Sequence, residues 1–360
     1  MKILHIVTSL ELGGAEKLLT ELLPEQKIGG NEIHLLILDL KGEIFLDSFK
    51  GKGILIHHTI IGNKKSYRNI LEISGLIRRE NFDIVHSHLT HAQIWTAGAR
   101  TLDKKKERVY ITTEHSTSNR RRGKEYFRHI DRWIYSKYNK VVCISKATEE
   151  ELLNWIGSKF KSKMTVIENG ISLLAFRGRV RDINLKEKEV KKLIMVSRFH
   201  RSKDHLTVVR VLEKLPKSYT LTFAGDGETM ESVKREVMQL GLQDRVMFLG
   251  YTDEISKLFK THDIAIQSSN YEGFGIGALE AMASGIPTIA TDVPGLSEVV
   301  EGGGLLFKLG DVNDLYEKIT ELENREKYHK ISKAGIERSN HFSIKTTAKK
   351  YVALYKKLMK

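Results

Sequence analysis

Short apolar runs alternate with helical stretches along the whole chain, in two successive series. Such alternation of β and α units predicts parallel sheets that are covered by helices on both faces. We therefore predict an α/β protein built from two doubly wound, Rossmann-like domains. The expected strands of the first series are residues 2–9, 32–39, 54–59, 83–88, 108–115, 140–145 and 164–169. Those of the second series are residues 192–197, 219–225, 245–250, 263–268, 286–291 and 303–308.

A charged segment separates the two series. The chain of 360 residues exceeds the usual size of one hydrophobic core. Residues 177–192, RGRVRDINLKEKEVKK, show little periodicity and are interpreted as a linker. The predicted domains are residues 1–176 and 193–341. Residues 342–360 form a final stretch in which apolar residues recur at helical spacing.

Composition narrows the class of protein. With 41% hydrophobic residues the chain is too apolar to be disordered, and no apolar run approaches the ~20 residues of a membrane span. The one cysteine, Cys143, lies in an apolar run and is expected in the core. The N-terminal apolar run is too short for a secretory signal, so a cytoplasmic location is expected. The net charge of +14 suits an anionic partner, such as a membrane surface, a phosphorylated substrate or nucleic acid.

Several candidate site residues follow strands of the first series. Ligands of doubly wound sheets bind at the carboxyl ends of the strands. Gly13 and Gly14 follow the first strand and suit a phosphate or a sugar oxygen, although a simple tight turn fits them equally. His86 and His88 are interpreted as satisfied polar groups. His115 ends the next strand, where a site is expected, and function and structure remain open for it.

The second series offers two cations at a strand end. Arg198 and Lys203 lie between an expected strand and a helix, and together they can hold a diphosphate. One such contact is worth about 4 kcal/mol at 4 Å and an effective dielectric near 20. Asp226 and Glu228 could ligate a metal, but two acids in one turn are usually solvated. We predict no required metal and no cofactor.

The stretch YEGFGIGALEAMASG, residues 271–285, combines carboxylates with bare backbone. A helix that begins near Gly275 leaves the amides of Phe274, Gly275 and Ile276 available to phosphate oxygens. Glu280, inside the helix, can accept hydrogen bonds from the two hydroxyls of a ribose. Glu272, on the loop, can accept them from a sugar. The spacing therefore predicts a site for two sugar rings joined by a diphosphate.

With these residues the chain resembles glycosyltransferase family 4, a group of retaining transferases with the GT-B fold. The resemblance covers nearly the whole chain, and the Glu-x7-Glu stretch is its most specific part. It rests on GGAE at 13–16, EH at 114–115, VCISKATEEEL at 142–152, IENGI at 167–171, SRFHRSKDH at 197–205, LTFAGDGE at 221–228, RVMFLGY at 245–251 and EGFGIGALEAMASGIPTIATDVPGLSEVV at 272–300.

The resemblance implies roles for residues of the second domain, which binds the nucleotide-sugar donor. Arg198 and Lys203 are similar to the pair that stabilises the leaving diphosphate in place of a metal. Glu280 resembles the ribose ligand, and Glu272 resembles the contact to the donor sugar. The base would be bound near Tyr251, mostly by backbone.

The resemblance also implies the overall plan and the reaction. Two domains face each other across a cleft, the acceptor binds the N-terminal domain, and the last helix crosses back to pack on that domain. His115 resembles the residue near the donor sugar, and Gly14 resembles part of a glycine loop over the diphosphate. Transfer of a hexose or N-acetylhexosamine with retention is expected, from UDP before GDP by family frequency. The acceptor would be a glycan or a polyprenyl-diphosphate-linked oligosaccharide of a bacterial surface polysaccharide, such as a capsule or O-antigen.

A basic loop follows His115. Arg120, Arg121, Arg122 and Lys124 are expected to meet a lipid-diphosphate acceptor or the anionic inner face of the cell membrane, unless they are simply solvated. The enzyme would then be peripheral to that membrane.

Four other functions compete with this interpretation. A nucleotide-sugar 2-epimerase of the same fold would turn over donor without acceptor. A glycosidase would use Glu272 and Glu280 as its acid–base pair, although their neighbours suit phosphate. A nucleic-acid-binding protein would suit the charge, but interleaved aromatics and a recognised module are missing from the sequence, so no nucleic-acid partner is expected. A non-catalytic nucleotide-sugar sensor would keep the same residues.

Overall fold

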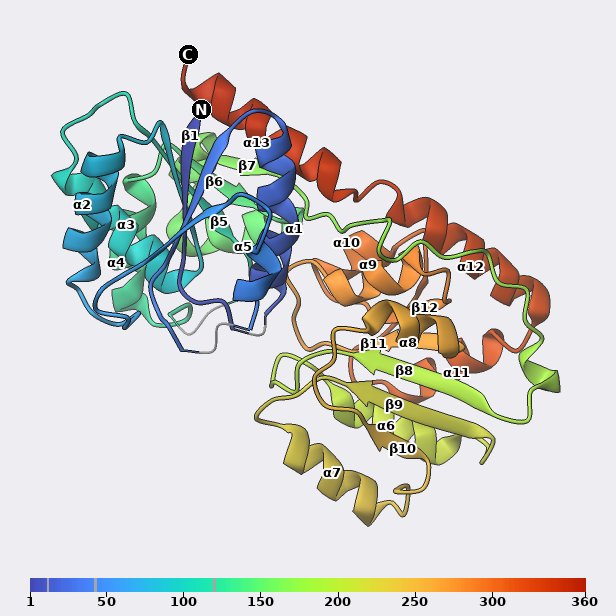
Figure 1. The fold of residues 1–360 in the computed structure, drawn as a ribbon. Coiled ribbons are helices and arrows are strands. Elements are labelled where there is room, and N and C mark those ends of the chain that lie inside the picture. Colours follow the sequence, from blue (N-terminus) through green and yellow to red (C-terminus); the bar gives the residue numbers. More distant parts are fainter. Residues whose placement is uncertain (12, 42–43, 119–120) are drawn as a thin grey trace. The chain divides into compact units, whose positions relative to one another are not determined.

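The computed structural model describes residues 1–11, 13–41, 44–118 and 121–360, which form two compact units (Figure 1). The first unit contains Met1–Gly170 together with Ile344–Lys360, and the second contains Ile171–Ser343. Each unit holds one parallel sheet with helices packed against it. The predicted α/β class with two Rossmann-like halves is confirmed.

The first sheet has seven strands in the order β3-β2-β1-β4-β5-β6-β7. Strand order therefore reverses between β1 and β4, which pair in parallel from Ile3 with Ile84 to Val7 with His88. Every strand expected in this half is present. The strands are β1 (Lys2–Val7), β2 (Glu32–Ile37), β3 (Leu55–His58), β4 (Ile84–His88), β5 (Val109–Glu114), β6 (Lys140–Cys143) and β7 (Met164–Val166).

The second sheet has six strands in the order β10-β9-β8-β11-β12-β13. Its order reverses between β8 and β11, and ligand sites of doubly wound sheets lie at such a reversal. All six expected strands are present here too. They are β8 (Lys191–Val196), β9 (Tyr219–Ala224), β10 (Val246–Phe248), β11 (Ile264–Gln267), β12 (Thr288–Thr291) and β13 (Leu305–Phe307).

Helices connect successive strands in both units. The predicted capped helix is α5, where the Ser145 hydroxyl accepts a hydrogen bond from the Thr148 amide. The helices of the first unit are α1 (Gly14–Ile28), α2 (Asn69–Glu80), α3 (Thr90–Leu102), α4 (Glu125–Ser136), α5 (Lys146–Ile156) and α13 (Ile344–Leu358). Those of the second unit are α6 (His205–Lys214), α7 (Met230–Gln239), α8 (Ile255–Thr261), α9 (Ile276–Ala283), α10 (Leu296–Val300), α11 (Val312–Glu321) and α12 (Arg325–Ser339).

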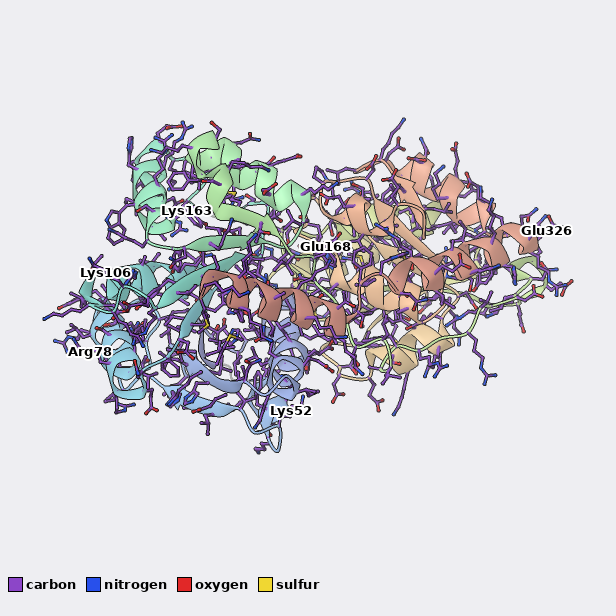
Figure 2. All side chains as sticks on the ribbon, turned by 90° about the horizontal axis from the view of Figure 1, so that it is seen from above. Lys52, Arg78, Lys106, Lys163, Glu168 and Glu326 are labelled. Atoms are coloured by element: carbon purple, nitrogen blue, oxygen red, sulfur yellow. The ribbon has the colours of Figure 1, made fainter. Side chains whose placement is uncertain are left out.

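The last helix belongs to the first unit. Helix α13 packs against α1, and the two lie side by side in Figure 1. Its Tyr351 and Tyr355 are fully buried. The Thr347 hydroxyl donates to the backbone oxygen of Glu168 at 3.0 Å, and Lys350 pairs with the Glu168 carboxylate at 3.4 Å; Glu168 is labelled in Figure 2. The chain thus begins and ends in the same unit.

Residues 177–192, predicted as a linker, lie inside the second unit. Leu185 is fully buried in the core of that unit, and the Arg181 guanidinium donates to the backbone oxygens of Phe259 and His262. Apart from a 3-10 turn at Leu185–Glu187 and the start of β8 at Lys191, the segment crosses the unit as irregular chain, which explains its lack of periodicity.

Candidate functional site

Arg198 lies two residues after the end of β8, at the carboxyl end of the strand beside the reversal. Its side chain is exposed, but the backbone on either side is anchored. The Ser197 amide donates to the Ala224 oxygen at 3.0 Å, and the Phe199 amide donates to the Asp226 oxygen at 2.9 Å. The turn after β9 therefore fixes the backbone that carries the guanidinium.

His205, at the start of α6, packs against the loop that carries Arg198. Its ring stacks on Phe199 at 4.1 Å between centroids, and its Nε2 lies 3.0 Å from the Ser197 hydroxyl. Burial lowers the pKa of His205 to about 3, so the ring is neutral at pH 7. Gly227 allows the turn after β9 to lie against the backbone of Phe199, because a Cβ there would lie 2.2 Å from the Phe199 oxygen.

Lys203 joins the loop after β8 to the loop after β11. Its ammonium forms an ion pair with the Glu272 carboxylate and lies 3.2 Å from the Ser269 hydroxyl. The Ser269 hydroxyl donates to the same carboxylate at 3.4 Å. The structure thus brings Lys203, one of the two predicted diphosphate residues, together with Glu272, the predicted sugar residue, and it adds Ser269 between them.

Helix α9 begins as the sequence predicts. Gly275 is its N-cap residue with φ +95°, a conformation that favours glycine, and a Cβ there would lie 2.4 Å from Leu296 Cδ1. The first amides of a helix have no carbonyl in a preceding turn. The Phe274 ring instead faces inward and packs edge-on to Phe342, so only its backbone can serve a ligand. Ile276 is the first residue of the helix.

Glu280 and Tyr251 occupy contrasting surroundings. Glu280 lies in α9 and is 3% exposed, so little of its carboxylate reaches solvent. Tyr251 follows β10, at the edge of the sheet, with its side chain 45% exposed. The Gly225 amide donates to the Gly250 oxygen at 2.8 Å, which joins the turns that follow β9 and β10. The loops that follow β8, β9, β10 and β11 therefore all lie at the carboxyl ends of the strands of the second sheet.

The candidate residues of the first unit lie at the corresponding edge of their own sheet. Gly13 is the N-cap residue of α1 and Gly14 its first residue. A Cβ on Gly13 would lie 2.1 Å from the Glu16 carboxylate, so that acid already occupies the helix start. His115 follows β5, and its Nε2 lies 3.2 Å from His88 Nδ1.

Two arginines of the expected basic loop turn away from solvent. Arg121 is 8% exposed and lies 3.2 Å from Asp131, because its guanidinium turns inward onto α4. Arg122 also turns inward, 3.7 Å from Glu114, and donates to the Thr117 oxygen. This corrects the sequence interpretation for both arginines.

Two residues of that loop remain to be placed. Lys124 is exposed and is the N-cap residue of α4. Arg120 lies outside the described residues.

Sequence reasoning missed several residues that the structure places near these positions. His205 lies in the quoted motif SRFHRSKDH, where its nearness to Arg198 in sequence was the available signal. Ser269 follows an expected strand end. His5, buried in β1, contacts His88 and has no such signal, because the contact depends on strand order.

The comparisons with known proteins cover both halves of the chain. The family model "Glycosyltransferase Family 4" matches residues 12–173, and the model "Glycosyl transferases group 1" matches residues 176–338. The uncharacterised glycosyltransferase MJ1178 of Methanocaldococcus jannaschii is 28% identical over 88% of this chain and 91% of its own. The O-antigen biosynthesis glycosyltransferase WbnH of Escherichia coli is 25% identical over 88% of this chain and 91% of its own.

A solved structure shares the fold. The crystal structure of Anabaena HepE in complex with UDP and glucose superposes with a TM-score of 0.85 at 20% identity, covering 99% of this chain and all of that one. At this identity the likeness shows the fold alone, and the fold is GT-B. Each half of the chain matches its own model, so the motif resemblance is confirmed along the chain.

Proposed function

Because the chain belongs to the family 4, or group 1, glycosyltransferases, we propose that it transfers a hexose or N-acetylhexosamine from a nucleotide-diphosphate sugar with retention of configuration. The observation that carries the proposal is the ion pair of Lys203 with Glu272, which joins the loop after β8, where Arg198 also lies, to the loop that leads into α9. Two cations, the first amides of a helix and a carboxylate match a diphosphate joined to a sugar.

The chemistry at this edge is charge stabilisation. As the bond between the anomeric carbon and the diphosphate breaks, negative charge grows on the leaving oxygens, and Arg198 and Lys203 oppose it. Glu272 accepts hydrogen bonds from the sugar, and Glu280 accepts them from the ribose. We propose that the two cations make a metal ion and a cofactor unnecessary.

Retention follows if the acceptor hydroxyl attacks from the face that the diphosphate leaves. The acceptor oxygen forms the new bond to the anomeric carbon, and its proton passes to the departing phosphate oxygen. The protein then supplies positioning rather than a nucleophile. Cys143 is no candidate for that role, because burial raises the pKa of its thiol.

The relatives support a donor and an acceptor class. The HepE structure contains UDP, which favours UDP as the donor nucleotide. WbnH is named for O-antigen biosynthesis, which favours a glycan or a lipid-linked oligosaccharide of the bacterial surface as the acceptor.

The donor assignment is tested with saturation-transfer NMR against a panel of UDP-, GDP- and ADP-sugars. One UDP-sugar should give a saturation-transfer signal, and Arg198→Ala should weaken that signal. Failure of every nucleotide sugar to bind would overturn the proposal. Conversion of the donor to its 2-epimer without acceptor would favour the epimerase, and an unchanged product yield in excess chelator is expected for the transferase.

We also propose that the enzyme works at the inner face of the cell membrane, through α4 rather than the basic loop. Tyr126, Ile130 and Trp133 form a stripe on the solvent face of α4 and are 61%, 46% and 45% exposed. Lys137 lies 5.1 Å from the Trp133 ring. Lys163, labelled in Figure 2, donates to the Ser136 and Tyr138 oxygens at the end of the helix.

Aromatic and aliphatic side chains bordered by lysines suit an anionic lipid surface. None of the helices in the described ranges is long and apolar enough to span a bilayer. Flotation with phosphatidylglycerol vesicles at low salt tests the stripe. Ile130→Ser with Trp133→Ser should abolish flotation, whereas Leu71→Ser, at a 63% exposed position on α2, should not. Equal flotation of both variants would refute the α4 surface.

A further inference from the structure

Four histidines form a continuous cluster in the first unit, on strands that the topology places side by side. His5 comes from β1, His86 and His88 come from β4, and His115 follows β5. His5, His86 and His88 are fully buried. His5 Nδ1 lies 3.0 Å from His88 Nε2, and His88 Nδ1 lies 3.2 Å from His115 Nε2.

The spacing of His5, His86 and His88 would also admit a metal ion, since one nitrogen of each lies within 4.8 Å of the others. Every nitrogen of these three rings, however, already has a hydrogen-bond partner. His86 Nδ1 lies 2.6 Å from the Tyr355 hydroxyl, and its Nε2 lies 2.8 Å from the Thr113 hydroxyl. His5, His88 and His115 therefore form a hydrogen-bond chain, and His86 is hydrogen-bonded to Tyr355 and Thr113 beside it.

The rings of this chain are neutral. Burial lowers the pKa of His5 to about 3 and that of His115 to about 4, and it lowers the pKa of His88 well below its ordinary value. A neutral imidazole has one N–H donor and one acceptor nitrogen. Each ring that accepts at one nitrogen must therefore donate from the other, so one end of the chain determines the other.

Gln26, on α1, stands at the far end. Its side-chain oxygen lies 2.9 Å from His5 Nε2, and its amide nitrogen donates to the Tyr355 hydroxyl at 3.4 Å. His5 therefore donates from Nε2 and accepts at Nδ1 from His88 Nε2. His88 then accepts at Nδ1 from His115 Nε2. The proton of His115 is thus on Nε2, and its Nδ1 carries a lone pair.

That last nitrogen has no hydrogen-bond partner within the described part of the chain, although it is buried. A buried acceptor without a donor costs about 1–3 kcal/mol. His115 lies at the carboxyl end of β5, where a doubly wound sheet receives ligands. We propose that Gln26, acting through His5 and His88, fixes the tautomer of His115 so that its Nδ1 accepts a hydrogen bond from a substrate hydroxyl.

Gln26 is a positioning residue in this arrangement. Were its amide reversed, each proton in the chain would move to the other nitrogen, and His115 would present a donor. The acceptor state favours a sugar hydroxyl or amide N–H and disfavours a sugar carboxylate, which can only accept. The identity of the substrate rests on the proposed function, but the tautomer does not.

The tautomer is measured on the ligand-free protein by long-range proton–nitrogen NMR with histidine labelled in nitrogen-15, His115 being assigned by its loss in His115→Asn. The wild-type protein should carry the His115 proton on Nε2. Gln26→Leu should mix the two tautomers, and Gln26→Glu should restore the Nε2–H form, because a carboxylate still accepts from His5. Tyr351→Phe is the control, because the Tyr351 hydroxyl contacts Thr113, which bonds His86 and is not part of the chain from Gln26 to His115.

A His115 proton on Nδ1 in the wild-type protein overturns the proposal, even if Gln26→Leu fails to fold. An unchanged tautomer in folded Gln26→Leu overturns it as well. If the tautomers behave as expected but no nucleotide sugar binds, the proposed function fails and this inference stands. With an active donor, Gln26→Leu should lower kcat/KM about tenfold, the loss of roughly one hydrogen bond, and Gln26→Glu should recover most of it.

Discussion

Arg198 and Lys203 reach the candidate site by different means, and this predicts different kinetic effects. Arg198 is exposed on a fixed backbone, so Arg198→Ala should lower kcat about 10²–10³-fold, the range for removing one charge-stabilising group. Lys203 also holds Glu272, so Lys203→Ala should raise the donor KM in addition. Initial rates with varied donor separate the two effects.

Arg201→Ala is the matched control, because Arg201 lies exposed in the same loop. Its rates should stay within about twofold of the wild-type rates, as expected for a surface substitution. Equal losses in all three variants would mean that the loop needs positive charge in general, and the separate roles would be wrong.

At the same scale, the sequence predicted chemistry near each strand end but not contacts across strands. Arg198, Lys203 and Glu272 were identified because each follows an expected strand. The ion pair between Lys203 and Glu272 depends on β8 and β11 being neighbours, and the chain from His5 to His115 depends on β1, β4 and β5 being neighbours. Strand order is set by long-range packing, which local periodicity does not encode.

The start of α9 shows how one element positions a site. Gly275→Ala adds a methyl group 2.4 Å from Leu296 Cδ1 at φ +95°, so either the Leu296 side chain or the helix start must shift, and the backbone is strained. Donor affinity should fall at least tenfold, since each 1.4 kcal/mol of lost contact is tenfold. Gly241→Ala is the control: φ is +65°, but no atom lies within 4 Å of the new Cβ. Calorimetric titration with the donor measures both.

Loss of affinity in both variants would show that backbone strain alone is responsible, against the argument from Leu296.

At the scale of elements, the strands can be predicted from the sequence, because short apolar runs between polar turns indicate buried parallel strands. The sequence-based prediction is wrong for Arg121 and Arg122, because their charge suggests exposure to solvent. Their carboxylate partners, Asp131 on α4 and Glu114 at the end of β5, are recognisable only from the folded chain.

The whole molecule depends on its last helix in an unequal way. Tyr351 and Tyr355 of α13 are fully buried in the first unit. Aromatic side chains bury roughly 150–250 Å² each, about 4–6 kcal/mol at 25 cal/mol per Å², which approaches the stability of a domain. A chain lacking residues 344–360 should therefore lose the fold of the first unit. The second unit has its own core between Leu185 and Tyr328 and should fold alone.

Tryptophan fluorescence tests this directly, because all three tryptophans, Trp95, Trp133 and Trp155, lie in the first unit. The shortened chain should show no cooperative fluorescence transition in urea, whereas residues 171–343 alone should show one by circular dichroism. A cooperative fluorescence transition in the shortened chain would contradict the dependence on α13.

The histidine chain makes the first unit sensitive to acid. The folded-state pKa values of His5 and His115 are about 3 and about 4, below the ordinary value near 6.5 of the unfolded chain. Below pH 6.5 the unfolded state therefore binds more protons, and stability falls as pH falls. Each histidine that stays neutral costs about 1.4 kcal/mol per pH unit, down to its folded pKa. Above pH 6.5 the effect vanishes.

The free energies of unfolding of the two units should therefore diverge as the pH is lowered from 7 to 5. Within the described residues, lowered pKa values occur at more histidines in the first unit than in the second. They are His5, His57, His86, His88, His91 and His115 in the first unit, and His205 and His262 in the second. The urea midpoint from tryptophan fluorescence should drop steeply with pH, and His5→Gln should flatten the slope by about one histidine, while His129→Gln, at an exposed position, should leave it unchanged. A midpoint that is equal at pH 5 and pH 7 would mean that the folded rings bind protons as readily as those of the unfolded chain, and the predicted acid sensitivity would be wrong.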